Sequence, residues 1–190
     1  MHSQHFSHSM WAKLAYAVLV GLVGAGIVHI AVLLLLPRLN ERDAWTRLAN
    51  TAGLYVVTPA DGSDRSQPVV GTPDPLFGAV ACRFDLEDGP VRLKAEGKVP
   101  FWSASIYDRS GQNIYSFNDR TATEGALDFV VATPTQMIEM RKDLPAELAS
   151  SIFVEADVGE GIVVIRSFAP DDSWSSIIST YLKSITCRTQ

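Results

Sequence analysis

The residues that could carry chemistry are unevenly placed along the chain. All four histidines lie within the first 29 residues, at His2, His5, His8 and His29. The remainder therefore lacks the imidazole that a Ser-His-Asp triad, a Cys-His pair or a histidine-ligated zinc or iron site requires. It also contains neither a P-loop nor a GxGxxG motif after an expected strand, so no nucleotide site is indicated.

The histidines themselves have simple structural interpretations. His2, His5 and His8 lie three residues apart and could bind a transition metal, but a solvent-exposed chain terminus explains them without one. His29 lies in an apolar segment, where a neutral imidazole could bond a backbone carbonyl, a headgroup or water, or else serve a function. We expect neither a metal nor another cofactor.

A group of polar side chains gathers around two expected turns. Tyr107 ends one expected strand and Asp108 begins the turn after it. Asn118 ends the next expected strand, and Asp119 and Arg120 follow it. They could form a shallow ligand site or a partner-contact surface, with Tyr107 and Arg120 most directly involved. The structural alternative is that Asp108, Asn118 and Asp119 are turn residues and that Arg120 pairs locally.

Paired carboxyl groups are the remaining route to catalysis. A carboxylate-based glycan-processing enzyme needs two of them about 5 to 10 Å apart in a cleft, one with a raised pKa. Asp108 together with Asp119 or Glu155 would be the pair to look for. The sequence alone assigns no catalytic residues.

The two cysteines, Cys82 and Cys187, are separated by most of the expected domain. Cys82 falls on the inward face of an expected strand, and Cys187 lies just beyond the last expected helix. A disulfide between them would fasten that helix to the sheet and contribute about 3 to 5 kcal/mol on a chain-entropy argument. Two unpaired thiols, with Cys82 filling core space, are the alternative. A redox role would require a CxxC pair, which the sequence lacks.

The elements that must position these residues centre on the stretch from Val99 to Ala132. Alternation of apolar and polar side chains predicts a strand over 101–107. Its apolar face consists of Trp102, Ala104 and Ile106. Turn residues separate it from strands expected at 113–118 and 127–131, so the sequence predicts a three-stranded meander.

Further elements flank the meander. Short strands are expected at 54–57, 80–86, 91–95, 152–157 and 162–168. A capping box at Thr133 and Gln136, with Pro134 at the first helical position, predicts a helix that ends before Pro145. Apolar residues from Trp174 to Ile185 recur at helical spacing, with Asp172 or Ser173 as the cap, and predict a helix packed on the sheet. Residues 58–78 are expected to form a surface loop.

An uncharged apolar segment runs from Leu14 to Leu36. Its 23 residues would span roughly 34 Å as a helix, enough to cross a hydrocarbon core of about 30 Å. A cleaved signal peptide is the alternative, but its apolar core is usually shorter and no small-residue cleavage site follows here. The expected organisation is therefore a tail (1–13), a transmembrane helix (14–36), a juxtamembrane helix capped by Asn40 (37–53) and a β-rich domain (54–190).

The sequence argues both ways about the sidedness of this anchor. Lys13 is the one basic side chain before it, whereas Arg38, Arg42 and Arg47 follow it, which by positive-inside counting keeps the domain in the cytoplasm. A short N-terminal tail is easily left inside, however, and the cysteine pattern suits an oxidising compartment. Beyond the anchor, 15 basic residues face 21 acidic ones, so nucleic acid and anionic lipid surfaces are poor partners for the domain.

Several separated motifs occur in an order that resembles a bacterial envelope family. They are Pro37-Arg38 at the end of the anchor, Ala81-Cys82-Arg83-Phe84-Asp85-Leu86, the run FWSASIYD from Phe101, Asn118-Asp119-Arg120-Thr121 and the late Cys187. Small membrane-anchored members of the domain-of-unknown-function family DUF1254, related to DUF1214, are similar to this chain over nearly its whole length. The resemblance implies a single-pass protein of the bacterial inner membrane with its C-terminal domain in the periplasm. It supplies no catalytic residues.

Two functions are consistent with these features, on an α+β fold with a mostly antiparallel sheet of about seven strands. The first is a non-catalytic interaction or scaffold module of the cell envelope, held in the lipid bilayer and docked onto a membrane or periplasmic protein. Gly21, Gly24 and Gly26, which would let another helix approach the anchor, favour it. The alternative is a carboxylate-based enzyme or small-ligand carrier that uses Asp, Glu, Tyr and Arg. We expect the first.

Overall fold

The structure is a computed structural model that describes residues 4–60, 74 and 76–190, with side-chain surroundings for residues 10–35, 45–60, 74 and 76–190. It divides into two units, Met1–Asn40 and Glu41–Gln190. Most of the loop expected over 58–78 lies outside the described residues, as do His2 and the side chains of His5 and His8.

The first unit is formed by helix α1, which spans Gln4–Thr51 and continues into the second unit. Within α1, the apolar stretch Met10–Leu35 has 26 residues and a mean hydropathy of 2.7, so it is long and apolar enough to cross a membrane. A signal sequence near the N-terminus would meet the same criterion. We expected a juxtamembrane helix over 37–53 capped by Asn40; in the structure, α1 continues through Asn40 to Thr51.

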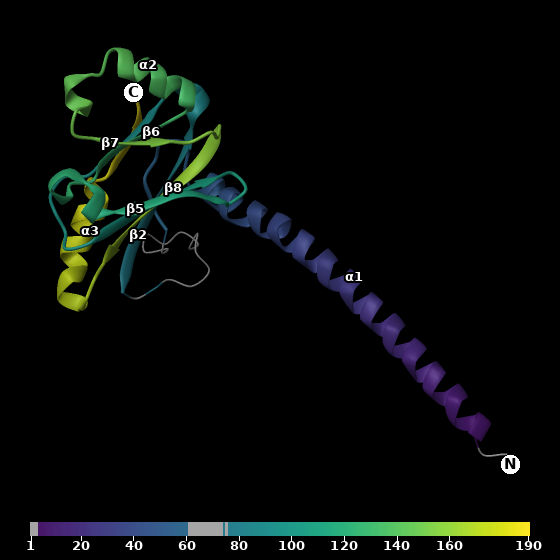
Figure 1. Cartoon of the computed structure of the whole chain (residues 1–190). Helices are drawn as coiled ribbons and strands as arrows, with labels where there is room; N and C mark the ends of the chain where they lie inside the picture. Colours follow the sequence, from purple (N-terminus) through teal and green to yellow (C-terminus); the bar gives the residue numbers. More distant parts are fainter. Residues whose placement is uncertain (1–3, 61–73, 75) are drawn as a thin grey trace. The chain divides into compact units, whose positions relative to one another are not determined.

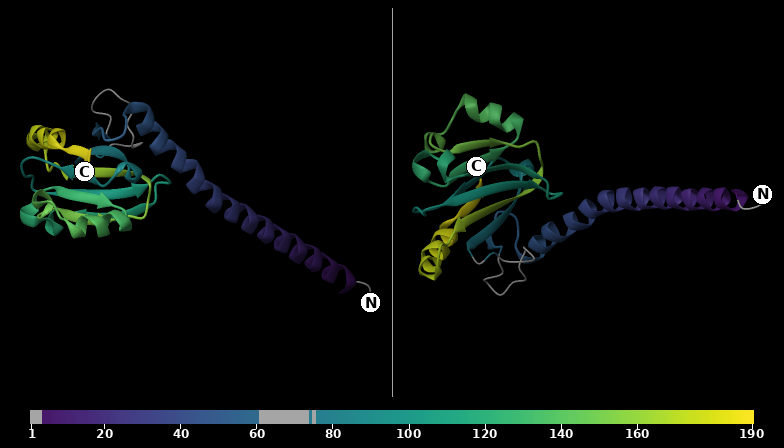
Figure 2. Two further views of the ribbon diagram at one scale, coloured as in Figure 1. Left: turned by 90° about the horizontal axis from the view of Figure 1, so that it is seen from above. Right: turned by 60° about the horizontal axis from the view of Figure 1, so that its bottom comes forward.

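The second unit is built on two sheets, seen in Figures 1 and 2. Sheet A has the strand order β1-β2-β8-β4-β5, and sheet B has the order β7-β6-β3-β9. The strands of sheet A are β1 (Thr58–Pro59), β2 (Phe77–Asp85), β8 (Glu160–Phe168), β4 (Trp102–Asp108) and β5 (Asn113–Asn118). Those of sheet B are β7 (Ile152–Glu155), β6 (Asp128–Ala132), β3 (Val91–Lys94) and β9 (Thr186–Thr189).

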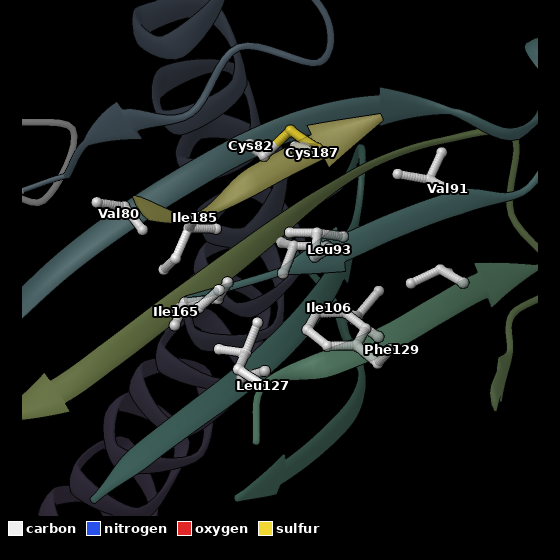
Figure 3. Close-up of a cluster of buried hydrophobic side chains, with 14 of the residues drawn as sticks. Val80, Cys82, Val91, Leu93, Ile106, Leu127, Phe129, Ile165, Ile185 and Cys187 are labelled. Atoms are coloured by element: carbon white, nitrogen blue, oxygen red, sulfur yellow. A yellow bond between two sulfur atoms is a disulfide. The ribbon is translucent and has the colours of Figure 1, made fainter. Parts of the chain in front are cut away.

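The α+β class is confirmed, but the single sheet that we expected is in fact two. Sheet A is antiparallel throughout, whereas sheet B is mixed because β6 and β7 run parallel. The hydrophobic core contains inward side chains of both sheets, and Figure 3 shows part of it around Leu93, Ile106 and Phe129. The alternation that predicted β4 is therefore real, since Trp102, Ala104 and Ile106 are fully buried there.

The expected three-stranded meander is wrong in its third strand. β4 and β5 pair as expected, but β6 lies in sheet B. Two short 3-10 turns, Asp119–Thr121 and Thr123–Gly125, redirect the chain between the sheets. In the same way, the 3-10 turn Leu86–Asp88 separates β2 from β3, which belong to different sheets.

Two helices follow in the second half of the chain. Helix α2 (Pro134–Lys142) has the expected capping box and contacts β6. Helix α3 (Ser175–Ser184) packs on β2 and β8. Its expected cap is wrong: Asp171 caps the preceding 3-10 turn by accepting a hydrogen bond from the backbone N–H of Ser173, and α3 begins after it.

The last turns of α1 are part of the second unit. Leu48 is 1% exposed and packs with Ala60, Ala81 and Ile162 on the face of sheet A that points away from the main core. The guanidinium carbon of Arg83 lies 4.8 Å from the centre of the Trp45 ring, and the arrangement is a cation–π contact. These contacts position the segment that leads into β1.

Candidate functional site

The expected contact residues Tyr107 and Asp108 lie at the end of β4. The Asp108 carboxylate accepts hydrogen bonds from the Ser110 hydroxyl at 2.6 Å and from the Gln112 backbone N–H at 2.8 Å. It therefore holds the tight turn into β5 together. Tyr107 is half-buried and lies opposite Ile162 of β8.

Asn118, Asp119 and Arg120 lie at the other end of β5. The Asn118 side chain accepts a hydrogen bond from the Arg120 backbone N–H at 3.1 Å and so caps the following 3-10 turn. Arg120 is exposed and forms no ion pair with any described residue. One carboxylate oxygen of Asp119 and the hydroxyl of Tyr181 on α3 are both buried without a hydrogen-bond partner among the described residues. Burial, and secondarily the charge of Asp119, raise the pKa of Tyr181.

The structure therefore does not bring the expected site residues together. Asp108 and Asp119 flank opposite ends of β5, and Glu155 is an exposed residue of β7 in the other sheet. No group of three or more His, Cys, Asp or Glu side chains placed to hold a metal ion occurs in the part of the chain that the structure describes. The structural alternative agrees better with these positions, because all three residues lie at turns: Asp108, Asn118 and Asp119.

A different feature stands out in the second unit, namely a groove of about 970 Å³ that is open to solvent. Three stretches that are distant in sequence supply most of its lining: the segment Tyr55–Pro59, the start of β2 from Phe77 to Val80, and the run from helix α3 into β9. We call it the α3–β9 groove. Gly78 lets helix α3 approach β2 closely, because a Cβ atom at this position would lie 2.8 Å from Cδ1 of Leu182.

The lining of the α3–β9 groove combines apolar and cationic side chains. Ile178 and Leu182 present the buried face of α3, while Val56 on the opposite side is 51% exposed. Lys183 and Arg188 are exposed and make no ion pair with described residues. The third charged residue of the lining, Asp74, accepts a hydrogen bond from the backbone N–H of Leu76 at 2.9 Å. The groove is thus cationic on a domain that carries a net negative charge.

Tyr55 holds one end of the groove in a fixed shape. Its φ angle of 62° lies in the left-handed region, a conformation that costs a non-glycine residue about 1 to 3 kcal/mol. Its hydroxyl lies 2.6 Å from a carboxylate oxygen of Asp88 and 2.9 Å from the carbonyl oxygen of Asp85. Burial and the hydrogen bond to Asp88 raise the pKa of Tyr55 to about 12, so the phenol stays protonated and remains a donor at neutral pH.

A disulfide joins Cys82 and Cys187, as Figure 3 shows, and it lies beside the groove because Cys187 belongs to the lining. It joins β2 of sheet A to β9 of sheet B, with the two Cα atoms 6.6 Å apart. The disulfide that we considered is therefore present, but it fastens one sheet to the other. We had expected it to fasten the last helix to a sheet, because β9 is too short to have been recognised.

Sequence reasoning predicted helix α3 but did not identify this groove as a site. β9 has four residues, Thr-Cys-Arg-Thr, with one buried side chain, so it offers no clear alternation. Tyr55 was expected to lie in a strand, whereas it lies in a turn before β1. The exposed pair Lys183 and Arg188, at the end of an amphipathic helix and just after it, is the one signal that the sequence could have offered.

Comparisons with known proteins found solved structures with a similar backbone and one matching family. Its backbone is similar to that of the VPA0106 protein from Vibrio parahaemolyticus, with a TM-score of 0.56 and 15% sequence identity, over 79% of this chain and 35% of that chain. An uncharacterised protein from Burkholderia cenocepacia has a TM-score of 0.45 and 13% identity, over 70% of this chain and 36% of the other. This chain thus spans about a third of the length of each. No curated protein matches it. The family model described as "Protein of unknown function (DUF1254)" matches residues 54–189, and the chain belongs to that family.

Proposed function

We propose that this protein is a single-pass protein of the bacterial inner membrane, with its C-terminal domain in the periplasm, that acts as a non-catalytic interaction or scaffold module. Its domain docks onto another membrane or periplasmic protein. The observation that carries the proposal is the α3–β9 groove, an open cleft lined by apolar side chains, two cations and strand edges. Such a lining supplies contact and hydrogen bonding for a polypeptide.

Two features support the membrane and the compartment. The stretch Met10–Leu35 is long and apolar enough to span a bilayer. The disulfide between Cys82 and Cys187 suits an oxidising compartment such as the bacterial periplasm. The motifs that resemble envelope proteins favour the same location.

The similarity to the longer Vibrio chain is compatible with a docking role. This chain covers 35% of that chain, so the shared fold is accompanied there by further polypeptide. A domain of this fold can therefore coexist with further polypeptide in one chain. In our proposal, the polypeptide against which the domain packs belongs to a separate protein.

A small-ligand carrier is the second candidate function. The groove volume of about 970 Å³ lies within the range of about 300 to 1,000 Å³ that small-molecule sites occupy. Tyr55 and Lys183 in its lining could then provide polar contacts. The carboxylate-based enzyme has less support, because Asp108, Asp119 and Glu155 do not converge.

Photo-crosslinking in intact membranes separates these functions. A benzophenone amino acid would replace Ser179 or Thr186, which line the groove, or Ile138 of α2, which is 60% exposed and lies outside the groove lining. We expect Ser179 and Thr186 to crosslink to one specific protein after illumination, and Ile138 to do so weakly or not at all. If none of the three positions yields a specific protein and the purified chain binds a small molecule, the carrier function replaces the docking function.

A further inference from the structure

One border of the α3–β9 groove is a strand edge that pairs with no further strand among the described residues. β9 is the last strand of sheet B, since the order is β7-β6-β3-β9, and it pairs with β3 on one side. The Gln190 backbone N–H donates to the Pro90 carbonyl at 2.8 Å, so residues 190 and 90 form a hydrogen-bonded pair of the ladder. In an antiparallel ladder the hydrogen-bonded pairs alternate, so Thr186 and Arg188 also bond toward β3.

It follows that Cys187 and Thr189 direct their N–H and C=O groups away from β3. Cys187 is only 4% exposed, whereas Thr189 is exposed, so the groups of Thr189 are the accessible ones. The pairing of β3 with β6, its neighbour on the other side, leads to the same assignment. There the Ala95 N–H donates to the Leu127 carbonyl at 3.0 Å. Residues 91, 93 and 95 therefore bond toward β6, which leaves residues 90, 92 and 94 for β9. No strand accounts for the outward groups of Cys187 and Thr189 in the part of the chain that the structure describes.

The opposite border of the groove is a poorer place for strand addition. The edge strand of sheet A, β1, has two residues, and one of them is Pro59, which has no N–H to donate. Edges shortened in this way and containing proline resist pairing with another chain, whereas β9 lacks proline. The two borders therefore differ, and β9 is the edge that can accept a strand.

The side chains beside β9 specify the chemistry of the added segment. Val56 in the groove lining is 51% exposed and offers apolar contact to an extended segment, and the exposed cations Lys183 and Arg188 favour an acidic one. We propose that an extended, acidic-and-apolar segment of a partner protein pairs with the open edge of β9 and extends sheet B by one strand. This inference rests on the docking function proposed above and specifies how and where docking occurs.

The main chain of Thr189 provides a matched pair of variants. Thr189→Pro removes the outward N–H and places a ring in the path of an added strand, but it removes no hydrogen bond to β3. Thr189→Ala keeps the N–H and removes the side chain. Since one hydrogen bond contributes about 0.5 to 1.5 kcal/mol, Thr189→Pro should weaken binding of an added strand about twofold to tenfold, and Thr189→Ala should leave it nearly unchanged.

Short random peptides displayed on phage and selected on the full chain in lipid nanodiscs provide the probe. We expect enriched sequences to alternate apolar with acidic residues and to lose affinity with Thr189→Pro and with Lys183→Glu. The same free peptide should slow hydrogen exchange of the Thr189 amide. Should Thr189→Pro fail to fold, Lys183→Glu and the protection of that amide decide the matter.

Three results would overturn the inference. Equal binding by Thr189→Pro and Thr189→Ala would show that the peptide does not use this edge. Enriched sequences with helical spacing of apolar residues would point to a helix in the groove. If no peptide is enriched but Ile138 gives specific crosslinks, the protein docks onto a partner through a surface other than β9. If no position gives crosslinks, the docking function is refuted as well.

Discussion

At the scale of single residues, Arg92 and Asp128 form a two-pronged, largely buried ion pair. Nε and Nη2 of Arg92 donate to the two carboxylate oxygens of Asp128 at 2.9 and 2.7 Å, and the Ser151 hydroxyl donates to the same carboxylate at 2.9 Å. Both ionic side chains are 13% exposed. Burial by itself would raise the pKa of Asp128, but the hydrogen bonds from Arg92 and Ser151 outweigh it, and the pKa is lowered.

This pair should govern part of the acid sensitivity of the fold. Because the folded-state pKa of Asp128 lies below its unfolded value of about 3.9, the stabilisation is complete above that pH and disappears as the pH falls through the folded pKa. Asp128→Asn should lower the free energy of unfolding at neutral pH by about 2 to 4 kcal/mol, since it leaves Arg92 without its counter-ion. It should also flatten the loss of stability below pH of about 4. Denaturant unfolding in detergent across this pH range measures both effects.

The exposed residue Asp157 is the matched control for this prediction. Asp157→Asn should keep the neutral-pH stability within about 0.5 kcal/mol and keep the acid slope of the unchanged protein. If the free energy of unfolding of Asp128→Asn fell with decreasing pH as steeply as that of the unchanged protein, the role assigned to the Arg92 pair would be wrong.

At the scale of elements, the packing of β8 between β2 and β4 depends on one glycine. A Cβ atom at Gly161 would meet the ring of Phe84 and lie 2.7 Å from the carbonyl oxygen of Tyr107. Gly161→Ala should therefore destabilise the domain by about 1 to 3 kcal/mol through overpacking. At Gly159 nothing lies within 4 Å of the same atom, so Gly159→Ala should change the melting temperature little. Thermal unfolding of the two variants makes the comparison, and equal melting temperatures would refute this account of β8.

The elements also show which information was local in the sequence. Strand β5 was predicted with its observed bounds of 113–118, and the capping box at Thr133 was predicted residue by residue, because alternation and capping depend on neighbours. Sheet membership depends on contacts between distant residues, so β6 was placed beside β5 although it belongs to sheet B. β6 is buried on both faces, as Val130 and Val131 show, and its alternation therefore carried no information about which sheet it joins.

At the scale of the whole molecule, the same reasoning explains why the groove was missed. Most of its lining comes from three separate stretches, so no local motif could mark it. The residues that did form a local motif, Asp108 and Asn118, serve the turns on which they lie. Composition was more informative at this scale. It predicted an apolar span over 14–36, which overlaps the stretch Met10–Leu35 of α1, and the position of the two cysteines suggested their pairing.

The sidedness of the whole protein and the state of its disulfide are linked predictions. If the domain lies in the periplasm, an enzyme reporter that is active only there should be active when fused after Gln190, and Cys82 and Cys187 should resist alkylation until a reductant is added. The bridge spans 105 residues, so replacing both cysteines with alanine should cost about 3 to 5 kcal/mol on a chain-entropy argument. An inactive reporter together with free thiols in unreduced cells would place the domain in the cytosol, where Arg38, Arg42 and Arg47 would agree with positive-inside counting. The partner of β9 would then have to be sought among cytosolic proteins, and the crosslink between the sheets would not hold the groove open in the cell.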